Sequence, residues 1–345
     1  MTWLNTIEVL HQMESDGLNV DDLVLDTGKK IKFGKLGSKK KRKTSWCVLH
    51  EFKIDKGVLL VGAYGDGPLF GLDSRKIDLN NYFDSIPEEQ RNAERARYRA
   101  EQAERAARHE AEEKILRQKA EEQALIDWDN AKGCTTESTY AKRKNIEVES
   151  ARVDAKGNLY VPMINYQTRT LVGVQKIFGN GDKLFTTGCA KLGAGVRLGA
   201  PIDSPETFTG DILICEGYAT GMSLRMASKM SVCVFVSFDA GGLLPLAVTI
   251  RELYPLARII FCADDDFLTV LKTKEHPEGV KYNVGRIKAA EAAKIIGRKM
   301  NQRATVIYPV FAKRGENKWT DFNDLHVVEG LDEVARQLKG VLHDN

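Results

Sequence analysis

The sequence is poor in cysteine and has no arrangement of cysteines that would bind zinc. Its six cysteines form no C-x-x-C pair and show no Cys/His ligand spacing. We therefore expect no zinc in this protein. Cys215, Cys233 and Cys262 fall within apolar runs, which predicts buried, reduced thiols.

Long apolar runs are also absent. No run approaches membrane-spanning length, and the N-terminus lacks the apolar segment of a secretion signal. These absences predict a cytoplasmic protein with no membrane partner. The segment Gly193-Ala194-Gly195 lacks the Gly-Lys-Ser/Thr ending of a nucleotide-binding loop, which favours a turn. The sequence also lacks a Walker motif, so we expect no fused helicase.

Net charge is small for the length, at +3 over 345 residues, but it is unevenly distributed. The stretch from Gly28 to Trp46 is rich in lysine and has no acid. We interpret part of it as a nucleic-acid patch, with Phe33 and Trp46 as stacking groups; a solvated hairpin tip is the alternative. The patch comprises Lys39, Lys40, Lys41, Arg42, Lys43 and Trp46.

Composition and periodicity divide the chain into five segments. Residues 1–85 predict a small α+β module, with a helix over Leu4–Met13 and two antiparallel strands. Residues 86–124 are rich in Ala, Glu, Arg, Lys and Gln without Gly after Pro87, which predicts a charged spacer helix, ~55 Å long. Residues 125–205 predict a strand-rich subdomain, 206–312 an α/β domain, and 313–345 a C-terminal helical segment.

The most informative stretch runs from Asp211 to Asp266. Three short apolar runs each end in an acid followed by a turn, and segments of helical period at Met222–Met230 and Leu243–Leu253 separate them. This β-α-β-α-β order predicts a parallel, Rossmann-like sheet with right-handed crossovers. Acids that follow such strands lie at the carboxyl edge of the sheet, where open α/β sheets bind ligands. These acids are Glu216, Asp239, Asp264, Asp265 and Asp266.

Carboxylates that crowd one edge repel each other unless a cation neutralises them. Oxygen-only ligands suit Mg²⁺ or Mn²⁺, and Mg²⁺ bound by few carboxylates completes its shell with water and substrate phosphates. The pattern therefore predicts phosphoryl-transfer chemistry. For Asp239 the sequence leaves two roles open, a metal ligand or a cap of the next helix.

A Glu-Gly after one strand and an Asp-x-Asp after a later strand resemble the signature of the toprim domain. The stretches CEGYATG, SFDAGGLLP, YPLARIIFCADDD and N-x-G-x-x-KA-x-x-AA are similar to those of DNA primases encoded by plasmids, phages and mobile elements. The resemblance extends upstream, to the Thr139–Lys144 segment, the Gly157–Pro162 run that opens a meander and the Gly179–Asp182 hairpin. It implies an α+β primase half domain beside the toprim domain.

The resemblance also implies roles for individual residues. Glu216 would act as general acid or base, and Asp264 and Asp266 would bind Mg²⁺ or Mn²⁺, with Glu216 and Asp239 as further members of the metal set. Nucleotide and template contacts would come from Lys142, Arg143, Lys176, Lys183, Gly217 and Gly221, the two glycines allowing a phosphate to approach. Asp265 is expected in a supporting or outward position.

The stretch Trp319–Leu325 resembles a box that follows toprim domains in primases. Within it, Asp321 and Asp324 are expected to cap the final helix, Leu331–Leu338, in preference to joining the metal site. The implied function is a DNA primase, a nucleotidyltransferase that joins ribonucleoside triphosphates on a single-stranded DNA template; a separate replicative helicase is a further partner to consider.

Other protein classes share parts of this pattern. A toprim nuclease, or a non-catalytic protein that binds single-stranded nucleic acid, remains an alternative. A haloacid-dehalogenase-type phosphatase needs Asp-x-Asp-x-Thr/Val, but Leu268 occupies that last position. A Rossmann dehydrogenase needs G-x-G-x-x-G, which Glu216-Gly217 does not supply, and a topoisomerase needs a larger gate and a nucleophilic tyrosine.

Overall fold

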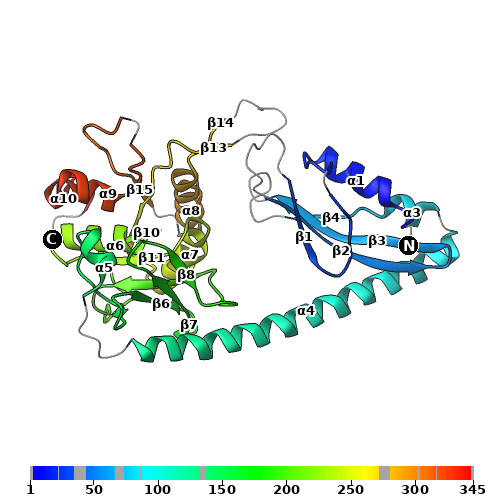
Figure 1. Ribbon diagram of the computed structural model, residues 1–345, viewed down its shortest axis with the longest axis horizontal. Coiled ribbons are helices and arrows are strands. Elements are labelled where there is room, and N and C mark those ends of the chain that lie inside the picture. Colours follow the sequence, from blue (N-terminus) through cyan, green and yellow to red (C-terminus); the bar gives the residue numbers. More distant parts are fainter. Residues whose placement is uncertain are drawn as a thin grey trace. The chain divides into compact units, whose positions relative to one another are not determined.

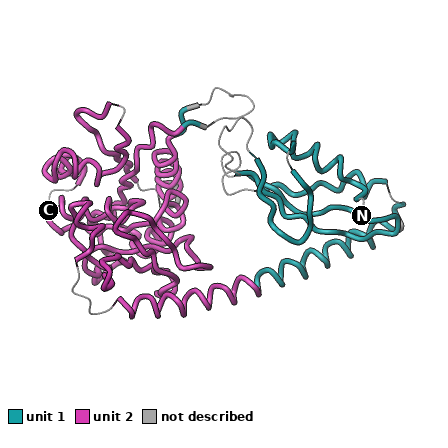
Figure 2. The backbone as a smooth tube through the Cα atoms, viewed as in Figure 1, with its two compact units in different colours: residues 1–110, 270–282 teal, residues 111–269, 283–345 magenta. Residues whose placement is uncertain are grey.

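The structure is a computed structural model. It describes the chain except for residues 1–2, 22, 35–43, 67–73, 86, 132–136, 272–279, 301–303, 316 and 343–345. The chain divides into two compact units (Figure 2): residues 1–110 with 270–282, and residues 111–269 with 283–345.

The first unit is built on a four-stranded antiparallel sheet in the order β1-β2-β3-β4. Its elements are α1 (Thr6–Ser15), β1 (Lys30–Phe33), β2 (Ser45–Ile54), β3 (Gly57–Asp66), β4 (Arg75–Lys76) and α3 (Asn80–Ser85), with β13 (Val270–Leu271) and β14 (Val280–Lys281) forming a separate pair. Val9 and Met13 of α1 are buried in its core together with Phe33. Phe33 is therefore a core residue, and the expectation that it stacks on nucleic acid is wrong.

Helix α4 (Glu88–Asn130) starts where Pro87 and Glu88 predict and continues beyond residue 124 for 43 residues in all. Its first part belongs to the first unit, where the Tyr98 ring packs edge-on against Phe52 at 5.1 Å. Its last part belongs to the second unit, where Ala120 and Ala124 are buried. Burial of Ala120 and Ala124 in the second unit explains why the helix extends past the predicted end.

The second unit is organised by one nine-stranded sheet (Figure 1). Its order is β15-β12-β10-β11-β9-β6-β7-β8, with β5 beside β6. The strands are β5 (Arg152–Val153), β6 (Leu159–Asn165), β7 (Thr170–Ile177), β8 (Lys183–Phe185), β9 (Ala194–Leu198), β10 (Asp211–Cys215), β11 (Cys233–Val236), β12 (Arg258–Cys262) and β15 (Thr305–Ile307). Strands β10, β11, β12 and β15 are parallel, which confirms the predicted β-α-β-α-β core. Strand β9 joins them antiparallel to β11, so the strand-rich segment continues the same sheet.

Helices cover both faces of the parallel strands because these strands alternate apolar side chains between two cores. Leu213 and Cys215 of β10 face a core shared with α6 (Tyr218–Ala227), α9 (Phe322–Glu329) and α10 (Leu331–Lys339). Ile212 and Ile214 face the opposite core, shared with α7 (Leu243–Leu253) and α8 (Val284–Met300). The short elements α5 (Thr139–Arg143) and η1 (Ala240–Gly242) complete the unit.

Several local predictions are confirmed. The Gly179–Asp182 turn links β7 and β8 as a hairpin, with Gly181 at φ +92°. Cys215, Cys233 and Cys262 are buried, and burial raises the pKa of their thiols. Gly193, at φ +81°, leads directly into β9, as expected of a turn. No helix within the described ranges is long and apolar enough to cross a membrane.

Candidate active site

Two acids meet at the carboxyl edge of the parallel sheet because they follow neighbouring strands. Cys215 of β10 lies opposite Cys262 of β12 in the parallel register. Glu216 follows the first strand immediately, and Asp264 follows the second after one alanine. The strand register therefore brings together the two acids that the sequence assigned to general acid/base work and to metal binding.

The environment of Glu216 raises its pKa to about 7, chiefly through burial. The negative charges of Asp266, Asp239 and Asp321 raise the pKa further, whereas the positive charge of Lys183 lowers it. Its Oε1 atom is buried and has no hydrogen-bond partner. An unpartnered buried carboxylate oxygen is costly, so this atom is available to a ligand.

Asp264 has the same character. Burial raises its pKa well above the usual range, and the charges of Glu216, Asp321 and Asp266 act in the same direction. Its Oδ1 atom is also buried without a partner. Burial and the repulsion between like charges therefore both favour the protonated forms of Glu216 and Asp264 in the absence of a cation.

These donors fit a particular type of cation site. Within the described part of the chain, no three His, Cys, Asp or Glu side chains are placed so that they could hold a metal ion together. Among the acids of this cluster, Glu216 and Asp264 each have one buried oxygen without a hydrogen-bond partner. Such a donor set fits Mg²⁺ or Mn²⁺ bound by one or two carboxylates with water and phosphate completing the shell, but not a site made entirely of protein ligands.

Asp266 lies at the N-terminus of α8. The Gly285 N–H donates to its Oδ2 at 3.1 Å, and its own N–H donates to Asn283 Oδ1 at 3.0 Å. A Cβ on Gly285 would lie 2.3 Å from the Asp264 carbonyl oxygen. The close approach explains why glycine occupies this position. The sequence interpretation assigned no role to Asn283 or Gly285, although both stand in the N-x-G motif.

Asp265 is held inside the protein by two arginines, at 3% exposure. Arg286 Nε lies 2.7 Å from its Oδ1, and Arg314 Nη1 donates to Oδ2 at 2.5 Å, while Asn283 Nδ2 donates to Oδ1 at 2.5 Å. Burial alone would raise its pKa, but the hydrogen bonds and positive charges lower it. The outward alternative for Asp265 is therefore wrong: it anchors the turn whose neighbours on both sides face the site.

Asp321 caps a helix and also belongs to the acidic cluster. Its Oδ1 accepts the Asp324 N–H at 2.7 Å, and Asp324 Oδ2 accepts the Thr320 N–H at 2.9 Å. The helix it caps is α9, so the expectation that it caps the final helix is wrong. Burial raises its pKa, as does the charge of Asp324. Since its charge raises the pKa of both Glu216 and Asp264, it contributes to their repulsion.

Asp239 adopts the capping role that the sequence left open. Its Oδ1 accepts the Gly242 N–H at 2.9 Å at the start of η1, and Lys191 donates to Oδ2. Both oxygens are therefore engaged. Asp239 acts on Glu216 through its charge.

Lys183 is the cation of the predicted set whose positive charge acts on both acids. It begins β8, is exposed, and lowers the pKa of both Glu216 and Asp264 through its positive charge. It forms no ion pair with any residue that the structure describes. An exposed cation near unpartnered carboxylates would suit a substrate phosphate.

The other predicted cations have protein partners. Lys142 pairs with exposed Glu137 at 2.6 Å, and Arg143 donates from Nη1 to the Asn180 carbonyl oxygen at 2.9 Å. Arg143 thus lies over the β7–β8 turn, where its Nη2 would be 2.4 Å from a Cβ on Gly181.

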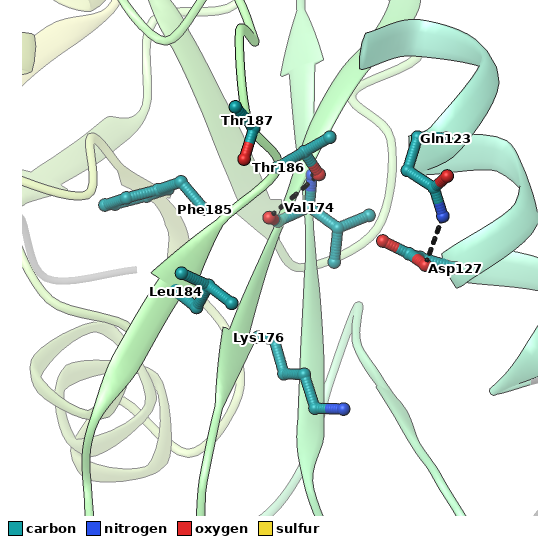
Figure 3. Close-up of a pocket in the computed structure, with 8 residues that line it drawn as sticks. All are labelled: Gln123, Asp127, Val174, Lys176, Leu184, Phe185, Thr186 and Thr187. Atoms are coloured by element: carbon teal, nitrogen blue, oxygen red, sulfur yellow. Dashed lines mark hydrogen bonds between the residues drawn. The ribbon is translucent and has the colours of Figure 1, made fainter. Parts of the chain in front are cut away.

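Lys176 lies in a polar network on β7. Its Nζ donates to the Tyr160 hydroxyl at 2.6 Å and lies 3.6 Å from Asp154. Burial lowers its pKa, but these two partners outweigh burial and raise it. Lys176 also lines a cavity of about 210 Å³, shown in Figure 3. The other lining residues are Gln123, Asp127, Val174, Leu184, Phe185, Thr186 and Thr187.

The two glycines of the Glu-Gly motif have different environments. Gly217 precedes α6 with extended backbone, and an added Cβ would lie 3.3 Å from the Thr220 hydroxyl oxygen. Gly221 lies inside the core, where a Cβ would meet Val236 at 2.8 Å and Leu198 at 2.9 Å. The expectation that Gly221 allows a phosphate to approach is therefore wrong, because side chains of the sheet fill the space beside it.

The predicted basic patch lies mostly outside the described residues. Lys39, Lys40, Lys41, Arg42 and Lys43 fall within the undescribed range 35–43. Trp46 is described and lies half-buried on β2 of the first unit.

Comparison with known proteins identifies the class of the parallel core. A family model of the toprim domain matches residues 211–332, from the start of β10 into α10. No curated protein sequence matches the chain.

The solved structures that match this chain include primase fragments, at low TM-scores. The primase fragment of the bacteriophage T7 primase-helicase is 15% identical, with 58% of this chain and 69% of that chain covered at a TM-score of 0.36. A DnaG primase catalytic domain bound to single-stranded DNA is 11% identical, with coverage of 66% and 82% and a TM-score of 0.38. The RNA polymerase domain of Mycobacterium tuberculosis DnaG is 15% identical, with coverage of 58% and 61% and a TM-score of 0.31.

Proposed function

We propose that this protein is a DNA primase of the type encoded by plasmids, phages and mobile elements. It would synthesise short RNA primers on single-stranded DNA by metal-dependent nucleotidyl transfer. The observation that carries the proposal is the pair of unpartnered buried oxygens, on Glu216 and Asp264, together with exposed Lys183, whose positive charge acts on both acids. The toprim match and the primase-like motifs of the sequence support it.

Primer extension requires the 3′-hydroxyl of the primer to lose a proton as it attacks the α-phosphate of the incoming nucleotide and displaces pyrophosphate. Glu216 is suited to accept that proton because its pKa of about 7 lies close to the working pH. Asp264 and Asp266 would hold Mg²⁺ or Mn²⁺, which when bound neutralises charge on the triphosphate. Asp265 keeps these two acids in place through its contacts with Arg286 and Arg314.

Phosphate contacts would come from the strand-rich part of the same sheet. Lys183 would contact the triphosphate, since its positive charge already acts on Glu216 and Asp264. Lys142 and Arg143 are exposed and would exchange their present partners for template phosphates. Lys176 contacts Tyr160 and Asp154, and would hold the strand-rich part of the sheet in position for these phosphate contacts. Gly217 leaves the backbone open beside Glu216. Single-stranded DNA and ribonucleoside triphosphates are the proposed substrates, and a separate replicative helicase is a proposed partner.

The test is primer synthesis on single-stranded DNA with labelled nucleotides and Mg²⁺ or Mn²⁺. Wild type is compared with Glu216→Gln, Asp264→Asn and, as a matched control, Glu206→Gln, which alters an exposed glutamate. Short labelled products from wild type and the control alone support the proposal. Cleavage of the single strand instead of synthesis would identify a toprim nuclease. Binding without synthesis or cleavage would refute the catalytic assignment in favour of a non-catalytic binding protein.

A further inference from the structure

The sheet of the first unit has two faces of different character. Cys47, Leu49 and Tyr64 alternate onto one face and are buried in the core with α1. Trp46 and Val48 point to the opposite face and are only half-buried. Helix α4 reaches this second face at Phe52, where Tyr98 packs against it. The face thus has a covered end at Phe52 and an accessible end at Trp46.

Cross-strand pairing defines what lies on the accessible end. Lys32 lies opposite Trp46, and Trp46 lies opposite Gly65. In the next row, Lys30 lies opposite Val48, followed across the sheet by Ala63 and Lys76. Directly paired residues share a face, so three exposed lysines and one tryptophan lie on the same surface. Neither row contains an acid.

The tryptophan ring lies close to the backbone of β3. A Cβ on Gly65 would be 2.9 Å from Cζ2 of Trp46, so a larger residue there would displace the ring. Lys30 Nζ lies 4.2 Å from the ring centroid. The exposed ammonium of Lys30 therefore occupies a position over the Trp46 ring that a stacked base can take. A base that displaces it leaves Lys30 free to contact a phosphate.

We propose that this surface, formed by Lys30, Lys32, Trp46, Val48 and Lys76, binds single-stranded nucleic acid. Cations in two rows match a phosphate backbone, and an aromatic ring on a flat sheet matches an unstacked base. A duplex keeps its bases stacked and offers the ring nothing to contact. The surface is distinct from the toprim site, and its binding does not depend on the nucleotidyl transfer proposed above.

The test measures binding of the full-length chain to a fluorescent oligo-dT over a range of salt concentrations. Trp46→Ala should weaken binding roughly 5- to 100-fold, which corresponds to one lost stacking contact. Lys30→Gln with Lys32→Gln should lower the slope of log affinity against log salt by about 1.4, from two lost phosphate contacts. Lys53→Gln with Lys56→Gln removes the same charge from the far end of the β2–β3 hairpin and should leave binding unchanged.

Each outcome decides the proposal. Wild-type affinity and salt slope in the Lys30/Lys32 variant would overturn it, and because both lysines are exposed that variant remains informative if Trp46→Ala fails to fold. Equal competition by duplex DNA would overturn the preference for single strands. Glu216→Gln should bind oligo-dT like wild type, so loss of primer synthesis and loss of this surface are separable.

Discussion

Replacement of Glu216 by glutamine should stabilise the second unit at alkaline pH when divalent cations are absent. The pKa of Glu216 is raised from 4.5 to about 7 in the folded protein. Its contribution to stability is complete below pH 4.5 and is lost as pH rises through 7, because the folded state then has to ionise a buried acid among like charges. The shift corresponds to about 3 kcal/mol at most, and glutamine does not titrate.

The assay is urea unfolding in EDTA at pH 5 and pH 8, followed by tryptophan fluorescence, to which Trp128 and Trp319 of the second unit contribute. The free energy of unfolding of Glu216→Gln should exceed that of wild type by about 1–3 kcal/mol at pH 8 and match it at pH 5. Mg²⁺ should reduce this difference in the free energy of unfolding, since a cation bound only by folded wild type stabilises wild type. Glu206→Gln, an exposed control, should show no such pH dependence. A glutamine variant that is no more stable than wild type at pH 8 would refute the proposed repulsion.

Three further predictions concern the surroundings of the acids. Arg314→Met removes one of the two arginines on Asp265 and should lower the free energy of unfolding by ~1–3 kcal/mol, with weaker Mn²⁺ binding measured by electron paramagnetic resonance; unchanged Mn²⁺ binding would contradict the anchoring role. Gly285→Ala places a Cβ against the Asp264 carbonyl and should cost ~1–3 kcal/mol in thermal or urea unfolding, whereas no loss would mean that α8 moves freely. Lys183→Ala should raise KM for nucleotides roughly 10-fold or more with little loss of folding stability, and an unchanged KM would exclude phosphate contact.

The parallel core was predictable because its strands are buried on both faces. Each strand is a nearly continuous apolar run, and the crossover helices between them have clear helical period. Leu243–Leu253 was therefore predicted with the bounds that the structure gives, whereas the helix predicted over Met222–Met230 lies earlier, at Tyr218–Ala227. The meeting of Glu216 and Asp264 follows from parallel pairing alone.

What the sequence did not reveal depends on contacts between distant residues. The ion pair of Arg314 with Asp265 joins residues 49 positions apart, and neither has a local signal for its partner. Gly221 shows why a glycine in a motif is ambiguous from sequence. The missing side chain can leave room either for a ligand or for close packing against the sheet. Asp321 stands in a recognisable cap motif, but the helix that it caps is the short one immediately after it.

The antiparallel pairing of β9 with β11 affects how the protein can be divided. The toprim match begins at Asp211, the first residue of β10. A fragment that started there would lack β9, and the backbone of Cys233–Val236 would become an unpaired apolar edge, a typical site of aggregation. Its core would also lose Val196 and Leu198, which are buried there. The segment that matches the toprim family is therefore shorter than the smallest piece expected to fold, which includes β9.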